Sequence, residues 1–496
     1  MTPIAVELTT ESRRLPVKGA IAMMGWPKRI GGLGASLAVG ALASVGFLVT
    51  LVVNPPAHFA DESAYVSQSG YWTLYRSGLW NDPTWLTYAG VDLPPLTKHL
   101  VGLALEVSGR TPPPPPVSER WYANISYRWE DDATLAVARV PVALVAGVGI
   151  GAVFALGRLA GGPLAGLLAA LLLAFNPLYS QAAGRAMSDA PAEALGLVAV
   201  ALTLSAWHVR LAQVLQSHAE TVRGSRPNRP RVGIGTWLAI GLFAGLATGS
   251  KLNAGATLFP AFVLIPLGLI VTRRLTLAIR LTLGALAASA TAFGVFVAIN
   301  PFVTARPDLE PWPPPGYPMR FLSRVDDSIP ARIQLILEHR WELTRASAEQ
   351  FPHHALNSLT AKAVSVAVQG FGRFGPLGPP PLNEHSLEWL SPRLDWGATI
   401  WLPLCLAGGV VLGRRGKDQL HNGTPPDAWA VLVWVAISWT IVLGFIPLAW
   451  DRYYLALQPG AAVLGAVGLT RLGSFPTTLL RRRFPPPPRF QAPPST

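Results

Sequence analysis

About ten runs of roughly 20 predominantly apolar residues recur along this chain, and they constrain its fold more than any other feature. A run of this length crosses the hydrocarbon core of a bilayer as an α-helix, and in lipid the backbone must satisfy its hydrogen bonds internally. The sequence therefore predicts an all-α integral membrane protein, a polytopic bundle of about ten transmembrane helices. The runs lie near 33–53, 134–157, 162–180, 190–209, 234–250, 254–272, 277–299, 396–413, 427–447 and 453–471.

The chain also has too little charge for an ordinary water-facing surface. Half of its residues are hydrophobic and 14% are charged, whereas a soluble domain carries about 25% charged residues. The first run is longer than the apolar core of a signal peptide, so we interpret it as a membrane anchor. The single cysteine, Cys405, falls inside a run, and one cysteine excludes an internal disulfide.

The net charge of +13 is explained by membrane topology rather than by nucleic-acid binding. With a cytoplasmic N-terminus and ten spans, the cytoplasmic segments carry 22 Lys and Arg against 5 Asp and Glu, and the opposite side carries 18 against 22. The basic clusters thus lie where the positive-inside rule places them. The sequence predicts a multi-pass protein of the cell membrane with no nucleic-acid partner.

Two long segments lie on the non-cytoplasmic side in this topology. The first contains two helical patterns and a polyproline spacer at 112–116. In the second, 329–351 carries an apolar stripe that indicates a helix lying on the bilayer surface. The predicted parts are a cytoplasmic segment 1–32, a membrane module 33–299 with a first external loop 54–131, a non-cytoplasmic loop region 300–395, C-terminal transmembrane helices 396–472 and a cytoplasmic Pro/Arg-rich tail 473–496.

Ionisable residues gather at the non-cytoplasmic ends of the spans. Near membrane depth such groups are costly unless they are paired or line a wet cavity, so they indicate a functional site. They are Asp61 and Glu62 in "FADESAYV", Lys98 in "DLPPLTK", Arg185 and Asp189 in "GRAMSDAPAE", Lys251 in "GLATGSK" and Arg452 in "PLAWDRYYL".

This mixture of residue types suits the transfer of a sugar from a lipid-linked phosphate. A carboxylate can deprotonate an acceptor hydroxyl, and cations can stabilise the negative charge that builds up on the departing phosphate. Arginine can bind two phosphate oxygens at once. The same residues also have structural explanations that the sequence leaves open: Asp61 and Glu62 as solvated acids at a helix N-terminus, Asp189 as a helix N-cap, Arg185 and Lys251 as cations that snorkel to the interface, and Arg452 as the partner of Asp451.

The order of these stretches and their common side resemble those of the GT-C glycosyltransferases. The nearest relatives are the protein O-mannosyltransferases of family 39 and the bacterial lipid A aminoarabinose transferases, and the resemblance covers about 30–300 and the last two spans. It implies a GT-C-like fold and an enzyme that moves a hexosyl or pentosyl group from a polyprenyl-phosphate donor to an acceptor hydroxyl. The transfer would take place on the non-cytoplasmic face, by an inverting displacement.

The resemblance also assigns roles to the candidate residues. The catalytic carboxylate of the family's first external loop falls on Asp61, and Glu62 and Asp189 are the further catalytic candidates. The candidates for binding the donor phosphate are Arg185, Lys251, Arg452 and Lys98. The implied partners are the polyprenyl-phosphate sugar, membrane lipids and an acceptor that is a protein, a lipid or a glycan.

No cofactor and no metal site is predicted, although a divalent metal is left open. His353, His354 and His385 share the second long segment, but their spacing fits no standard metal site.

Two alternatives belong to other functional classes. A transporter or flippase of lipid-linked substrates would show internal repeats and polar groups at the midplane of the membrane; the sequence shows no repeat, and its polar residues cluster at the ends of the spans. A GT-C-shaped scaffold without catalysis would keep Asp61 as an inert residue.

Overall fold

A computed structural model describes residues 27–118, 120–125, 130–221, 232–307, 324–376 and 396–483. Within these ranges the regular elements are helices, and an isolated antiparallel bridge joins Ala355 to Leu448. Most of the predicted N-terminal segment, the end of the predicted tail and His385 lie outside the described residues.

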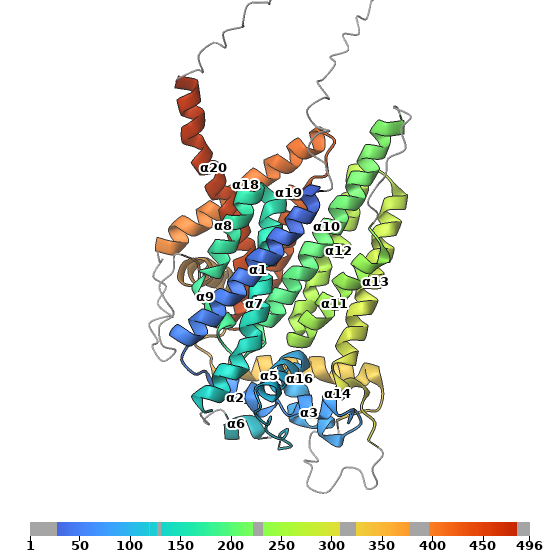
Figure 1. Ribbon diagram of the computed structural model, residues 1–496, viewed down its shortest axis with the longest axis vertical. Helices are drawn as coiled ribbons and strands as arrows, with labels where there is room; N and C mark the ends of the chain where they lie inside the picture. The colour runs from blue at the N-terminus through green and yellow to red at the C-terminus, as the bar shows by residue number, and fades with distance from the viewer. Residues whose placement is uncertain are drawn as a thin grey trace, which may run out of the picture.

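The long helices run side by side and form the membrane bundle (Figure 1). Seven segments of the described residues are long and apolar enough to cross a membrane, and α8 with α9 makes an eighth that is bent by 67°. Eight of the ten predicted runs lie on these segments, and the runs at 234–250 and 396–413 lie on two further helices, α11 and α18, that are not among them. The prediction of an all-α, multi-span membrane bundle is confirmed. The helices are α1 (Pro27–Val53), α7 (Asp132–Gly161), α8 (Pro163–Ala174), α9 (Pro177–Ala183), α10 (Asp189–Thr221), α11 (Ile234–Ser250), α12 (Phe259–Thr272), α13 (Leu275–Ala298), α18 (Trp396–His421), α19 (Asp427–Phe445) and α20 (Gln458–Arg483).

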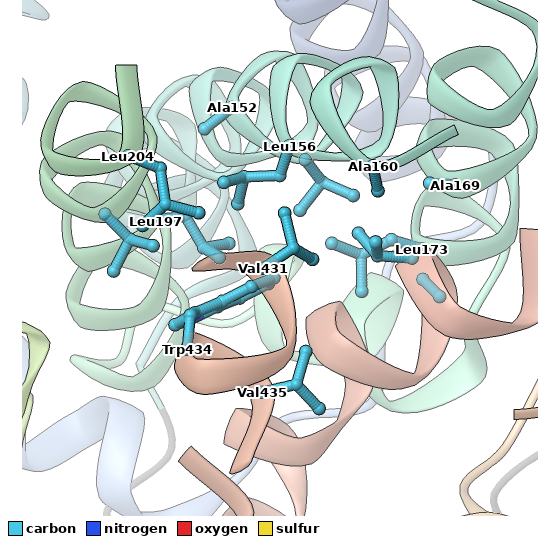
Figure 2. Close-up of a cluster of buried hydrophobic side chains, with 14 of the residues drawn as sticks. Ala152, Leu156, Ala160, Ala169, Leu173, Leu197, Leu204, Val431, Trp434 and Val435 are labelled. Atoms are coloured by element: carbon cyan, nitrogen blue, oxygen red, sulfur yellow. The ribbon is translucent and has the colours of Figure 1, made fainter. Parts of the chain in front are cut away.

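Small residues allow these helices to pack closely. A Cβ atom added to Gly241 of α11 would lie 2.4 Å from the carbonyl oxygen of Ala288 on α13, and one added to Gly245 would lie 2.6 Å from that of Ala292. Helices in lipid gain little from the hydrophobic effect when they associate, so such close backbone contacts supply much of the attraction. In the centre of the bundle, Figure 2 shows side chains of α7, α8, α10 and α19 packed against one another, among them Leu156, Leu197 and Trp434.

The predicted span 162–180 is broken rather than continuous. Asn176 caps α9 by accepting a hydrogen bond from the backbone nitrogen of Tyr179 at 3.0 Å, and Pro177 opens the helix. The Asn176 amide donates to the carbonyl of Phe374 at 2.9 Å and to Gln458 at 3.0 Å, so the break is held by two distant segments. The bend carries α9 and the residues that follow it to the end of the bundle where the short helices lie.

Short helices form a layer at that end (Figure 1). Its core combines residues of the first external segment, including Tyr71 and Trp85, with residues near the second, including Phe302 and Leu335. The two long segments that the sequence placed on one side of the membrane therefore pack together. The layer contains α2 (Ala60–Ser67), α3 (Tyr71–Arg76), η3 (Pro83–Leu86), α4 (Tyr88–Asp92), α5 (Pro95–Val107), α6 (Trp121–Ile125), α14 (Pro301–Thr304) and α16 (Ile329–Gln350).

Two buried polar side chains of α16 fasten this helix to the layer. The Arg332 guanidinium donates to the carbonyls of Phe302 and Ala305, and His339 contacts Asp92 of α4 at 3.3 Å. The opposite face of α16 leaves Leu337 and Trp341 exposed. The predicted amphipathic helix thus buries Leu335 and Ile336 against protein and keeps part of its apolar stripe on the outside.

A later part of the second segment enters the bundle, which the sequence analysis did not anticipate. The helix α17 (Leu359–Ser365) continues into the π-helical turn η5 (Val366–Arg373), which packs on α18. Val366 and Phe371 belong to the main apolar core of the bundle. The run is short and interrupted by glycines, so its hydropathy does not distinguish it from a loop.

Candidate active site

Five of the seven predicted site residues meet between the bundle and the end layer. Asp61 lies in the first turn of α2, Asp189 begins α10, and Lys251 follows the last residue of α11. Arg452 lies in the 3₁₀ turn η7 (Asp451–Tyr453), which precedes α20. All of these positions are helix ends, and they come from four separate parts of the chain. A small cavity of about 20 Å³ lies among them, lined by Phe59, Leu178, Gln181, Ala182, Arg185, Met187, Asp189, Asp451, Arg452 and Leu455.

Asp61 is held by two partners that are distant in the sequence. Its Oδ2 atom accepts a hydrogen bond from Nη1 of Arg452 at 2.7 Å, and its Oδ1 atom accepts one from the hydroxyl of Tyr122 on α6. The side chain of Asp61 is 18% exposed, so it is partly shielded but still reachable from outside. A carboxylate in this setting is oriented and accessible, as a general base must be.

Asp189 and Lys251 form a second ion pair in the same cluster. Nζ of Lys251 donates to Oδ1 of Asp189 at 2.6 Å, and the ammonium lies 5.8 Å from the centre of the Tyr453 ring. The carboxylate is 7% exposed, whereas the lysine is 27% exposed. The Lys251 ammonium therefore has an accessible side that a further anion can approach.

The two arginines lie on aromatic rings, which fixes the planes of their guanidinium groups. Arg185 lies 4.4 Å from the centre of the Phe59 ring, and Arg452 lies 4.8 Å from that of Trp450. Such stacking sets the plane in which the N–H groups of each guanidinium can donate to oxygen atoms. Both arginines line the cavity that Asp189 also lines.

The backbone that carries Arg452 is fixed from outside the cluster. The stretch 354–356 pairs with 447–449: the Leu356 nitrogen donates to the carbonyl of Pro447 at 2.9 Å, and the Ala449 nitrogen donates to that of His354 at 2.8 Å. This short antiparallel pairing ends two residues before Asp451. It sets the position from which the Arg452 side chain extends.

Glu62 has surroundings that oppose the predicted catalytic role. Its side chain is 0% exposed, and its oxygens accept hydrogen bonds from Arg139 of α7 at 2.8 and 2.7 Å. The backbone nitrogens of Phe59 and Ala186 donate to the same carboxylate at 3.1 and 2.7 Å. All of these donors are protein groups, so Glu62 has no free face for an acceptor, and we assign it a structural role instead.

Lys98 also departs from its predicted role. It is 1% exposed, and its ammonium donates to the carbonyls of Ala89 and Gly90 at 3.0 Å each, with the Tyr71 ring at 4.6 Å. Burial strongly lowers the pKa of this lysine, which further weakens it as a phosphate ligand. It lies in the core of the end layer and is not among the residues that line the cavity.

The sequence analysis missed two polar groups at the site. Desolvation of the Tyr122 hydroxyl, and then the negative charge of Asp61, raise the pKa of this tyrosine, so it remains a neutral donor to the carboxylate. Glu193 lies one helical turn after Asp189 on the same face of α10, within electrostatic reach of Lys251. Tyr122 follows a proline-rich stretch with no pattern of its own, and 61 residues separate it from Asp61.

Among the described residues, no group of three or more His, Cys, Asp or Glu side chains is arranged to hold a metal ion. His353 and His354 lie beside the paired stretch 354–356, outside the cluster of Asp61 and Asp189. His385 lies outside the described residues.

Comparisons with known proteins give structural matches only. No family model matches the chain, and no curated protein matches it. Similar solved structures include ArnT from Cupriavidus metallidurans bound to undecaprenyl phosphate, with 16% identity, a TM-score of 0.44 and coverage of 90% of this chain and 63% of that one. They also include the oligosaccharyltransferase AglB from Archaeoglobus fulgidus, in complex with an inhibitory peptide and a dolichol-phosphate, with 14% identity, a TM-score of 0.49 and coverage of 94% and 53%.

The same archaeal oligosaccharyltransferase in complex with Zn and sulfate matches with 15% identity and a TM-score of 0.48, covering 90% of this chain and 52% of that one. This chain therefore spans between about half and two thirds of the length of these solved structures. At these identities, and with TM-scores below 0.5, the matches carry no argument about the activity of this chain.

Proposed function

We propose that this chain is a membrane glycosyltransferase that takes a sugar from a polyprenyl-phosphate donor and transfers it to an acceptor hydroxyl. The observation that carries the proposal is a small cavity lined by Arg185, Asp189 and Arg452. Asp61 is joined to this lining through its ion pair with Arg452, and Lys251 through its ion pair with Asp189. An acid within reach of cations, at the ends of membrane helices, provides both a base for a hydroxyl and counter-charges for a phosphate. A lipid-linked donor keeps its tail in the bilayer, so its phosphate reaches the protein at this depth.

In the proposed reaction, Asp61 takes the proton of the acceptor hydroxyl. The acceptor oxygen attacks the anomeric carbon, and the bond from that carbon to the phosphate oxygen breaks, with its electron pair going to the oxygen. The products are the glycosylated acceptor, protonated Asp61 and a polyprenyl phosphate with one more negative charge than the donor. Arg185, Lys251 and Arg452 would stabilise this added charge, and attack from the side opposite the phosphate would invert the anomeric centre.

The transporter alternative fits this arrangement less well. Secondary transporters place their substrate groups near the midplane of the membrane, between discontinuous helices. The charged cluster here lies at the first residue of α10, just after α11 and just before α20, next to the end layer. A cluster at helix ends favours chemistry at the surface of the bundle over passage through it.

The phosphate-binding role of the cations is tested by neutralising them one at a time. We expect Arg185→Gln and Lys251→Gln to weaken the binding of a short-chain polyprenyl phosphate by about ten- to hundredfold each, the effect of one lost charge-assisted hydrogen bond. Titration in detergent micelles measures this affinity, and Lys251→Arg should restore most of it. Arg324→Gln is the control, since Arg324 is paired with Glu342 on an exposed face of the end layer. Unchanged affinity in both variants would assign Arg185 and Lys251 a purely structural role.

We further propose that the end layer faces the non-cytoplasmic side, as the distribution of charge along the sequence predicts. In a Cys405→Ala background, Asp327→Cys on the end layer should react with a membrane-impermeant maleimide added to intact cells. Lys417→Cys, near the end of α18, should react only after permeabilisation. A cysteine at position 327 should be accessible to the reagent, because the Asp327 side chain is 95% exposed. Replacement of the buried Cys405 removes the native thiol from the experiment. The reverse labelling pattern would place the site in the cytoplasm and rule out this orientation.

A further inference from the structure

Two of the three cations of the site are already paired with its carboxylates. Arg452 binds Asp61, and Lys251 binds Asp189, at 2.7 and 2.6 Å. Asp451, which also lines the cavity, accepts a hydrogen bond from the backbone nitrogen of Arg452. Three cations, Arg185 among them, therefore stand against three carboxylates, so the cluster is close to electrically neutral before any phosphate is added.

The space beside these ion pairs is also small. The cavity has a volume of about 20 Å³, which is only slightly more than the roughly 10–15 Å³ that one water molecule needs. A phosphate group with its ester oxygens needs several times that volume. An anion can approach the exposed side of Lys251, but one that takes the Nη1 atom of Arg452 must displace the Asp61 carboxylate to which this atom already donates.

The anchoring of the backbone indicates which side chain moves. Glu62 fixes the start of α2 through Arg139 and the Ala186 nitrogen, so the backbone of Asp61 is held. The pairing of 354–356 with 447–449 holds the backbone that leads to Arg452. Both backbones are fixed, so the change falls to the side chains, and the long arginine has far more rotational freedom than the aspartate.

We propose that the donor phosphate binds by exchange: its oxygens take Arg452 from Asp61, and this exchange frees Asp61 to act as the base. This exchange rests on the proposed function, and it means that binding of the donor activates the base that its own reaction needs. While Arg452 donates to Oδ2 and Tyr122 donates to Oδ1, both oxygens of Asp61 already accept a hydrogen bond. Loss of Arg452 leaves Oδ2 open to the acceptor hydroxyl when a donor is in place.

The exchange predicts that removal of one site residue, Asp61, raises the affinity for polyprenyl phosphate, whereas loss of a residue that binds the donor would lower it. Asp61→Asn and Asp61→Ala remove the competitor for Arg452, so both should bind a short-chain polyprenyl phosphate about three- to tenfold more tightly than wild type, the weight of one modest hydrogen bond. Arg452→Gln should bind it more weakly, and Asp61→Asn in the Arg452→Gln background should give no gain. Asp327→Asn, an exposed aspartate that also contacts an arginine, is the matched control and should leave the affinity unchanged.

Two titrants separate the possible sources of the phosphate. If the Asp61 variants bind polyprenyl phosphate more tightly than wild type does, but not the same polyprenol without its phosphate, the exchange is supported. If they also bind inorganic phosphate more tightly, the phosphate group alone is enough to displace Asp61 from Arg452. Equal or weaker binding of polyprenyl phosphate by Asp61→Asn and Asp61→Ala would overturn the exchange and leave the proposed function standing. If wild-type protein binds no polyprenyl phosphate, the proposed function fails and the exchange fails with it.

Discussion

Asp61→Asn should reduce sugar transfer about 100- to 10,000-fold while the protein still folds and still binds donor. Asparagine keeps the shape of aspartate and can still accept the hydrogen bond of Tyr122, but it carries no charge to hold Arg452 and cannot take a proton, and loss of general-base assistance costs this much in rate. The measurement is the rate at which purified protein moves labelled sugar from lipid-linked donors extracted from the native membrane. Thermal unfolding and donor titration on the same samples show that fold and binding are intact.

The exposed Asp327→Asn variant serves as the matched control for this experiment and should transfer sugar at the wild-type rate. Asp189→Asn gives the decisive comparison, because Asp189 is the other carboxylate of the cluster. If Asp61→Asn keeps most of its turnover while Asp189→Asn loses it, the base is Asp189, and Asp61 only orients Arg452.

Glu62→Gln should cause the largest loss of stability of any single change at the site. It leaves Arg139, with 4% of its side chain exposed, buried without a counter-ion, and breaking a buried ion pair from one side costs about 3–5 kcal/mol. The measurement is the midpoint of thermal or denaturant unfolding in a defined detergent. Glu342→Gln, which breaks a comparable pair on an exposed face of α16, should leave that midpoint nearly unchanged.

A double variant separates charge from packing at this pair. The backbone nitrogens of Phe59 and Ala186 donate to different oxygens of Glu62, and glutamine at position 62 can accept from one of them. Combining Glu62→Gln with Arg139→Met therefore removes the buried charge and keeps one of those two hydrogen bonds. We expect the double variant to be more stable than Glu62→Gln alone. A double variant that is the less stable of the two would mean that Arg139 stabilises the fold through its other contacts rather than through the ion pair.

The sequence was sufficient to predict the helical membrane bundle, because apolar runs of span length have few other uses. It was insufficient where tertiary contacts override local pattern. The span at 162–180 bends because Asn176 finds partners in Phe374 and Gln458, which are about 200 and 280 residues away. The segment 366–373 enters the bundle through packing on α18, which no short hydropathy pattern encodes.

The site shows the same division between local and long-range information. Their order along the chain and their position at span ends made Asp61, Asp189, Arg185, Lys251 and Arg452 candidates. Three of them line one cavity, and Asp61 and Lys251 are ion-paired to that lining. The pattern could not separate Asp61 from Glu62, since one step along a helix rotates a side chain by about 100° and turns one acid toward the site and the other into the protein. Lys98 looked equivalent to the other cations until its carbonyl partners were known, and Tyr122 became visible only through its contact with Asp61.

The hydrogen bond from the Ala186 nitrogen to Glu62 fixes the relative position of two parts of the proposed site. Glu62 adjoins Asp61 in the chain, and the Ala186 nitrogen that donates to Glu62 adjoins Arg185, so a single contact of 2.7 Å sets the spacing between the proposed base and a proposed phosphate ligand. Neither α6 nor α16 takes part in that contact. Substitutions on the exposed face of α16 should therefore leave the spacing between Asp61 and Arg185 intact, whereas changes in α6 would disturb the hydrogen bond from Tyr122 to Asp61.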